Sequence, residues 1–114
     1  MRKLKSTDVF EGLRLIKRSG LKESLVPIIA KLARDKDNPE EVGIVGILTM
    51  IEVFSDAKCE HIIYEWLSGP FERSPEEIRD MDLDELTLNL QSLAEENDLR
   101  NFFTVLSGLL SRKH

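Results

Sequence analysis

The sequence has 114 residues, of which 41% are hydrophobic and 32% are charged, and its net charge is −5. A chain of this length fits a single domain, residues 1–114, that can bury a core. Its composition is too apolar for a disordered chain and too charged for a membrane protein. The longest apolar run, Val42 to Phe54 interrupted by Glu52, is shorter than the roughly 20 residues needed to cross a bilayer.

The charges divide the chain unevenly. Residues 1–36 carry a net charge of +6 and residues 37–114 a net charge of −11. We therefore distinguish basic helices over 1–36, acidic helices over 37–110 and a frayed tail over 111–114. This asymmetry suits nucleic acid, an acidic partner or self-association, and equally two ends that neutralise each other within the fold. The single cysteine and the lack of an apolar signal core near the start favour a reducing cytoplasm.

The spacing of apolar side chains predicts helices and no β-hairpin. A first helix is capped at Ser6 or Thr7 and stops at Gly20, a residue that tolerates the left-handed backbone of a helix end. A second helix follows over about residues 21–35. Pro27 lies inside this pattern and requires either a start near Ser24 or a kink.

A third helix, about residues 39–54, has the strongest start signal of the first half. Asn38 provides the cap and Pro39 the first helical residue, a position that needs no N–H donor. The helix is apolar nearly all round, so we expect it to be central in the bundle. Gly43 and Gly46 are expected to let a neighbouring helix approach closely.

A fourth helix, about residues 57–67, is predicted to start at the caps Ser55 and Asp56. Gly69 is expected to stop it and Pro70 to prevent its continuation. Phe71 would then lie outside any helix. The apolar contacts of this helix are assigned to Ile62, Ile63 and Trp66.

Three further helices have clear start signals. Ser74-Pro75-Glu76-Glu77 begins a short one, Asp82 with Glu85 begins the next, and Asn97-Asp98 begins the last. The resulting prediction is an all-α, compact single-domain bundle of six to seven short helices around a central apolar helix over about residues 39–54.

Candidate catalytic groups are few. Cys59, Glu60 and His61 are neighbours, but residues i and i+2 of a helix point to different faces, so neither a zinc site nor a Cys–His nucleophile is expected. The Gly-x-x-Gly sequence over residues 43–46 resembles an RNA-clamping loop, but its apolar middle fits helix packing better. Paired carboxylates all stand at helix ends or on polar faces. We therefore expect no enzymatic activity, no metal and no cofactor.

Basic residues around the first helix offer an alternative function, that of a small helical nucleic-acid-binding regulator. The region lacks the Asn and Gln side chains that read bases, and the whole chain is acidic, so a solvated basic face is the simpler interpretation. The candidate basic patch consists of Lys3, Lys5, Arg14, Lys17, Arg18 and Lys22.

Most aromatic side chains lie on apolar stripes and are expected in the core. Phe71 is the exception, and it either fills the joint between two helices or is displayed to solvent. Exposed aromatic side chains rimmed by acidic residues would form a partner-binding patch. The candidate partner-binding residues are Tyr64, Trp66, Phe71, Phe102 and Phe103.

Five stretches then follow one another in an order that carries a family resemblance. They are Glu41-Val42-Gly43, Tyr64 to Phe71 (Tyr-Glu-Trp-Leu-Ser-Gly-Pro-Phe), Ser74 to Ile78 (Ser-Pro-Glu-Glu-Ile), Met81 to Leu86 (Met-Asp-Leu-Asp-Glu-Leu) and Asn97 to Phe103 (Asn-Asp-Leu-Arg-Asn-Phe-Phe). Together with the basic helical start, they make residues 40–110 resemble the small tail assembly chaperones of long-tailed, siphovirus-type bacteriophages or prophages of Gram-positive bacteria.

This resemblance implies a helical, non-virion protein that acts in the cytoplasm of the bacterial host. It implies binding to the tape-measure protein, and recruitment of tail-tube subunits through a longer, frameshifted form. The family contributes no catalytic residue, metal or cofactor. Neither a membrane nor nucleic acid is an expected partner, whereas self-association remains open.

Overall fold

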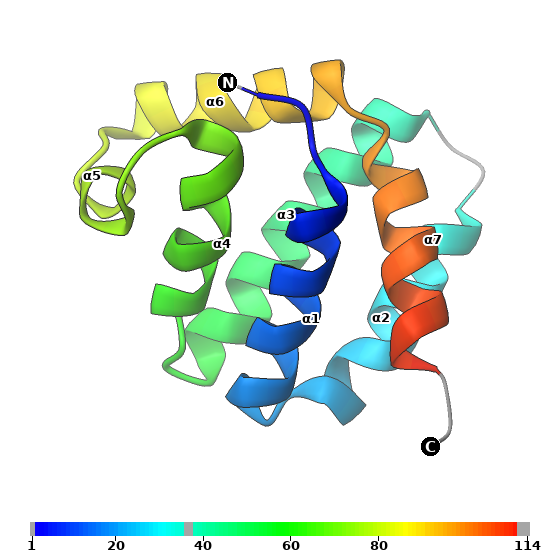
Figure 1. Ribbon diagram of the computed structural model, residues 1–114. Coiled ribbons are helices and arrows are strands. Elements are labelled where there is room, and N and C mark those ends of the chain that lie inside the picture. Colours follow the sequence, from blue (N-terminus) through cyan, green and yellow to red (C-terminus); the bar gives the residue numbers. More distant parts are fainter. Residues whose placement is uncertain (1, 36–37, 112–114) are drawn as a thin grey trace.

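The computed structural model describes residues 2–35 and 38–111, and over these residues the chain forms seven α-helices and no strand (Figure 1). The predicted all-α bundle is confirmed. The tail predicted to fray lies outside the described residues except for Ser111, as does the predicted boundary between the basic and acidic parts at residues 36 and 37. The helices are α1 (Ser6–Ser19), α2 (Lys22–Arg34), α3 (Pro39–Asp56), α4 (His61–Phe71), α5 (Pro75–Arg79), α6 (Leu83–Glu96) and α7 (Leu99–Leu110).

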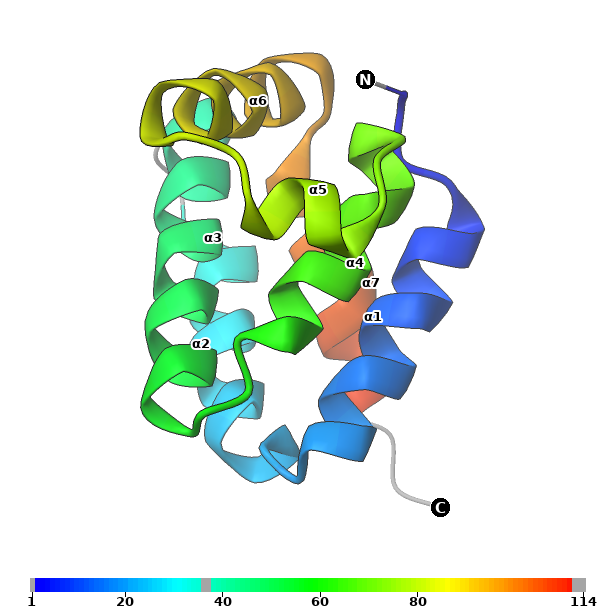
Figure 2. The same cartoon turned by 90° about the vertical axis from the view of Figure 1, so that its left-hand side faces the viewer.

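The helices enclose one apolar core. α2 and α7 have the most extensive mutual packing, and α1 contacts α2, α4 and α7. α3 contacts α2, α4, α6 and α7, and α5 packs on α4. α6 lies across one end of the longer helices (Figures 1 and 2). No helix among the described residues has both the length and the apolarity to cross a membrane.

Side-chain caps begin four helices at the predicted places. Asn38 accepts from the Glu40 N–H at 2.8 Å, and Asp82 accepts from the Glu85 N–H at 2.8 Å. Ser74 and Glu77 form a reciprocal capping box, and Asp98 caps α7. The Gly20 stop of α1 is also confirmed, because its φ of 77° is left-handed. These signals were readable because each cap and its partner lie within three residues.

The predicted cap of α1 is wrong by one residue. Ser6 and Thr7 are both helical, and the capping position is Lys5. The Lys5 N–H donates to the Asp8 carboxylate at 2.7 Å, so an acid in the first turn, rather than a hydroxyl group, links the capping residue to the helix. α2 begins at Lys22, so Pro27 lies inside the helix rather than in its first turn.

The region around α4 needs the largest correction. α3 continues to Asp56, so Ser55 and Asp56 do not cap the next helix, and α4 begins only at His61. α4 also continues through Gly69 and Pro70 and ends at Phe71. The left-handed residue that ends it is Glu72, whose N–H donates to the Gly69 carbonyl at 3.1 Å.

α3 is in contact with four helices but is not surrounded by them. Val45 and Leu48 are each 54% exposed, so the expectation of a central helix is correct only for its inner side. The expected close approach at the glycines is confirmed. A Cβ at Gly43 would lie 2.7 Å from Leu99, and one at Gly46 would lie 2.5 Å from the ring of Phe103. Because neither glycine has a side chain, α7 can approach α3 closely at both positions.

Candidate partner-binding surface

Two of the five predicted partner-binding residues belong to the core. Phe71 is 5% exposed and Phe103 is 3% exposed, so neither is displayed to a partner. Phe71 is buried because α4 continues to it and turns its side chain inward with Leu67. Phe103 is buried because Gly46 leaves room for its ring. The alternative in which Phe71 fills the joint between helices is therefore the correct one.

The other three candidates are half-buried and do not form one patch. The rings of Trp66 and Phe102 are in tilted contact with centroids 5.3 Å apart, and Phe102 lies edge-on to Phe103 at 5.7 Å. Tyr64 instead lines a separate depression with residues of α4 and α5. The predicted acid-rimmed aromatic patch is therefore not present as an assembled surface of these five residues.

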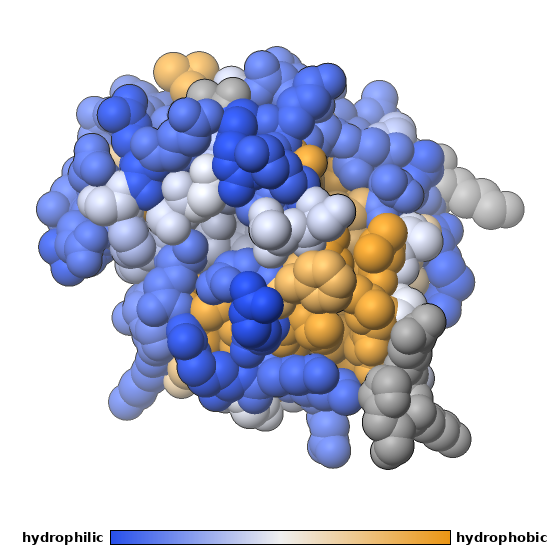
Figure 3. Space-filling view, in the orientation of Figure 1, coloured by the Kyte–Doolittle hydropathy of each residue, from blue (hydrophilic) through white to orange (hydrophobic). Residues whose placement is uncertain are grey.

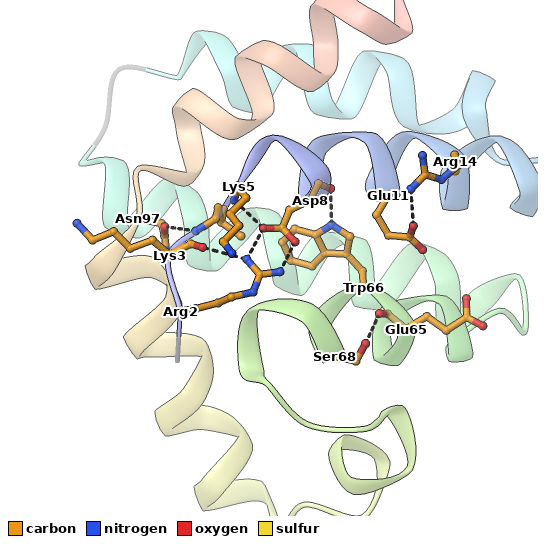
Figure 4. Close-up of polar contacts among 11 residues, drawn as sticks. Arg2, Lys3, Lys5, Asp8, Glu11, Arg14, Glu65, Trp66, Ser68 and Asn97 are labelled. Carbon is orange, nitrogen blue, oxygen red and sulfur yellow. Dashed lines mark hydrogen bonds and ion pairs between the residues drawn. The ribbon is translucent and has the colours of Figure 1, made fainter.

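An apolar cavity of about 80 Å³ lies behind the Trp66–Phe102 pair. Its walls come from α1, α3, α4 and α7, and they include Gly12, Ile47 and Phe103. The Trp66 indole N–H donates to the Asp8 carbonyl at 3.0 Å, which fixes the ring at the edge of the cavity (Figure 4). The cavity belongs to the core between these helices.

A partly buried ion pair holds the N-terminal segment on α1, beside the end of α4 (Figure 4). The guanidinium of Arg2 makes two hydrogen bonds to the carboxylate of Asp8, at 2.7 and 2.8 Å, and the Asp8 side chain is 7% exposed. A Cβ at Gly69 would lie 2.8 Å from the Arg2 guanidinium, so this glycine makes room for the pair. The Arg2 N–H also donates to the Pro70 carbonyl at 3.0 Å. Sequence reasoning missed this network, although Asp8 is the first acid in a basic segment.

Two opposing effects set the pKa of Asp8. Burial is the largest and raises the pKa, because a carboxylate loses solvation. The hydrogen bonds from Arg2 and from the Lys5 N–H, together with the positive charges of both residues, outweigh burial and hold the pKa below its ordinary value. The same hydrogen bond raises the pKa of Arg2. The pair is therefore ionised at neutral pH.

On the side of the molecule shown in Figure 3, an exposed apolar surface lies where α1 and α7 meet. The two most exposed large apolar side chains among the described residues, Leu83 at 80% and Leu88 at 64%, lie elsewhere, on α6. Phe10 on α1 is 51% exposed and Val105 on α7 is 45% exposed. Half-buried residues at helical spacing from these two continue the surface on each helix. We call this surface the α1–α7 face and define it by Phe10, Leu13, Phe102, Val105 and Leu109.

Basic side chains border the α1–α7 face along α1. Arg14 and Lys17 are exposed one turn beyond Phe10 and Leu13, respectively. Arg14 bonds Glu11 on its own helix at 2.8 Å, and Arg18 pairs with Glu65 of α4. Lys3 and Lys5 precede α1, and Lys22 begins α2. The six predicted basic residues are thus distributed over several positions, and two of them adjoin the α1–α7 face.

A second exposed apolar surface lies on α3. Glu41, Val45, Leu48 and Glu52 follow one another at spacings of four, three and four residues, and all four are exposed. They therefore share the outer side of the helix. We call this stripe the α3 outer face. It is apolar in the middle and acidic at both ends.

Phe10 falls under the expectation that most aromatic side chains lie in the core, yet it is exposed, and no sequence signal singled out Val105. Gly12, Leu15 and Ile16 face inward, and a helical wheel places Phe10 well away from these buried positions. That signal was present in the sequence. The sequence does not show, however, which side of the apolar stripe a neighbouring helix covers.

Groups suited to chemistry are scattered. Within residues 2–35 and 38–111, no three His, Cys, Asp or Glu side chains are grouped so as to hold a metal ion. The thiol of Cys59 donates to the Ala57 carbonyl at 3.4 Å, and His61 is exposed at the start of α4. Comparison with family models, with curated proteins and with solved structures found no match.

Proposed function

We propose that this protein is a tail assembly chaperone of a long-tailed bacteriophage or prophage. It acts without catalysis in the cytoplasm of the bacterial host and binds the tape-measure protein. A longer, frameshifted form recruits tail-tube subunits. The resemblance of residues 40–110 supports the family, and the α1–α7 face is the observation that carries a binding function.

The α1–α7 face has the properties of a helix-binding surface. Among the described residues, eighteen apolar side chains form one buried cluster; Leu13 and Phe102 pack against it, whereas Phe10 and Val105 are not part of it. Exposed apolar side chains lower the solubility of a protein, and the fold does not need Phe10 and Val105 to be exposed. Two packed helices with apolar side chains along their junction accept a third helix through its own apolar stripe. A tape-measure protein is a long helical client that offers such stripes.

Co-expression with the tape-measure protein of the same genome tests this proposal. We expect the two proteins to co-purify, and we expect Phe10→Asp with Val105→Asp to weaken the complex by at least about 10-fold, because exposed apolar anchors are replaced by charges. Val45→Asp with Leu48→Asp is the matched control, since these residues are exposed to a similar degree on another helix. Two soluble proteins that do not co-purify would contradict the proposal.

The alternative of a nucleic-acid-binding regulator has weaker support. Arg14 and Lys17 are exposed, as phosphate binding requires, but apolar side chains occupy the surface beside them. A regulator of this kind would bind duplex DNA or RNA with an affinity that falls steeply with salt. Absence of a mobility shift at low salt would eliminate it.

A further inference from the structure

We propose that the segment bound by the α1–α7 face is an amphipathic helix with acidic flanks. The inference rests on the proposed function and adds the chemistry of the client. It reverses the expectation of an acid-rimmed binding patch, since the apolar surface that the structure exposes between two helices has basic neighbours.

The charge around the α1–α7 face is positive. Arg14 and Lys17 stand one turn beyond Phe10 and Leu13 on α1. Asp8 contributes little, because it is buried against Arg2. The Glu11 side chain is 44% exposed and is bonded to Arg14. α7 carries no Asp or Glu from Leu99 to Leu110, and the two acids of α1 are each paired with an arginine, so among the described residues Lys17 is left as the unpaired charge of this rim.

The centre of the α1–α7 face selects a peptide helix over nucleic acid. Most protein contacts to nucleic acid go to phosphate and sugar oxygens, and an apolar surface offers them no hydrogen bond or charge. A helix with apolar residues at positions i, i+3, i+4 and i+7 presents one stripe to Phe10, Val105 and Leu109. Carboxylates beside that stripe then reach Arg14 and Lys17 at the rim. Rim charges of this kind set association rate and partner choice more than affinity.

The residues that flank the α3 outer face are acidic rather than basic, so this face disfavours the same client. Val45 and Leu48 are as exposed as Phe10, but Glu41 and Glu52 flank them. An acidic helix placed there would meet like charges, which cost affinity. The α1–α7 face and the α3 outer face therefore differ mainly in the sign of the charge around them, and each serves as the control for the other.

Two synthetic helical peptides test the inference on the unmodified protein. Both carry the same leucine stripe, one with glutamates and the other with lysines on its flanks. We expect the glutamate peptide to bind on the order of 10-fold more tightly at low salt, with the difference shrinking as salt is added. Equal binding, or tighter binding of the lysine peptide, would overturn the inference. So would displacement of the glutamate peptide by duplex DNA at physiological salt.

Reversing the charges beside each face then shows which face determines the preference between the two peptides. Arg14→Glu with Lys17→Glu is expected to invert the preference between the two peptides, and Glu41→Lys with Glu52→Lys is expected to leave it unchanged. All four positions are exposed, and circular dichroism verifies that the variants remain helical. An inversion caused by the α3 variant would contradict the proposed face. Peptide-independent dimers formed by α3 of a second copy on the α1–α7 face would also overturn it.

The outcomes separate this inference from the function that it rests on. If the tape-measure protein co-purifies but peptide charge has no effect, the chaperone proposal stands and the acidic client is wrong. If the glutamate peptide binds at the α1–α7 face while the tape-measure protein does not co-purify, the face has an acidic helical client from another protein.

Discussion

The α1–α7 face and the α3 outer face expose apolar side chains to a similar degree but differ in their surroundings. Phe10 is 51% exposed and Val45 is 54% exposed, so exposure alone does not distinguish them. The first face lies along the junction of two helices and has basic neighbours, whereas the second is a stripe on one helix between two glutamates. The shape and the rim charge of an apolar surface, rather than its exposure, indicate what it binds.

α7 connects the two regions. Its Leu99 and Phe103 contact Gly43 and Gly46 on the inner side of α3, and its Val105 and Leu109 contribute to the α1–α7 face. A change that displaces α7 should therefore alter the α1–α7 face, while a change on the outer side of α3 should not. Four expected effects follow, from the largest to the smallest.

Truncation of Phe103 should have the largest effect on stability. Its ring is 3% exposed and lies against Gly46, so Phe103→Ala should lower the free energy of unfolding by about 3–5 kcal/mol. Val105→Ala, on the exposed side of the same helix, should change it by less than about 1 kcal/mol. Urea denaturation measures both, and similar losses at the two positions would show that α7 packs differently.

Two glycines should respond to alanine with opposite signs. A Cβ at Gly46 would lie 2.5 Å from the ring of Phe103, whereas nothing lies within 4 Å of a Cβ at Gly108. Gly46→Ala should destabilise by about 1–3 kcal/mol through overpacking. Gly108→Ala should stabilise by up to about 1 kcal/mol, because alanine favours the helix. Thermal unfolding distinguishes the two, and stabilisation by both would contradict the close approach of α3 and α7.

Acid should weaken the anchor of the N-terminal segment. The pKa of Asp8 is lower in the folded protein than its ordinary value, so the stability that the ion pair contributes is present above about pH 4 and is lost as pH falls below it. Asp8→Asn should cost about 2 kcal/mol at neutral pH and should flatten the acid limb of the stability curve. Glu11→Gln, in an exposed pair, should change stability by less than about 0.5 kcal/mol. Identical acid limbs for wild type and Asp8→Asn would exclude this role.

The outer side of α3 should be the least sensitive region. Val45→Lys and Leu48→Lys should each change the free energy of unfolding by no more than about 0.5 kcal/mol, because both side chains are largely exposed. Neither should affect client binding, in contrast to Phe10→Lys. Chemical denaturation and co-purification check the two parts, and loss of the client with Val45→Lys would move the binding surface to α3.

Features that depend on residues close together in the sequence were predicted correctly, and features that depend on distant residues were not. Helix starts at Asn38, Ser74, Asp82 and Asp98 were predicted correctly, because a cap and its partner are three residues apart or fewer. The stop expected at Gly69 is wrong, since α4 continues to Phe71 and Glu72 takes the left-handed conformation. Gly69 instead leaves room for the Arg2 guanidinium, a contact 67 residues away in the sequence that local patterns do not predict.

The candidate site was predicted less well than the fold. A helical stripe identifies apolar side chains, but only packing decides that Phe103 is buried and that Phe10 is displayed. Adjacent residues of a helix point about 100° apart, so Phe102 and Phe103 cannot both face the core, but only the packing shows that Phe102 is the one at its edge. The charge asymmetry was visible in the sequence, whereas its placement beside the α1–α7 face required the arrangement of α1 and α7.

Amide chemical-shift mapping with a helical fragment of the tape-measure protein tests the central claim most directly. We expect the perturbed residues to cluster on α1 and α7, around Phe10, Leu13 and Val105. The signals of Val45 and Leu48 on α3 should not move. Perturbations that instead centre on the outer side of α3 would contradict the assignment of the α1–α7 face as the client-binding surface.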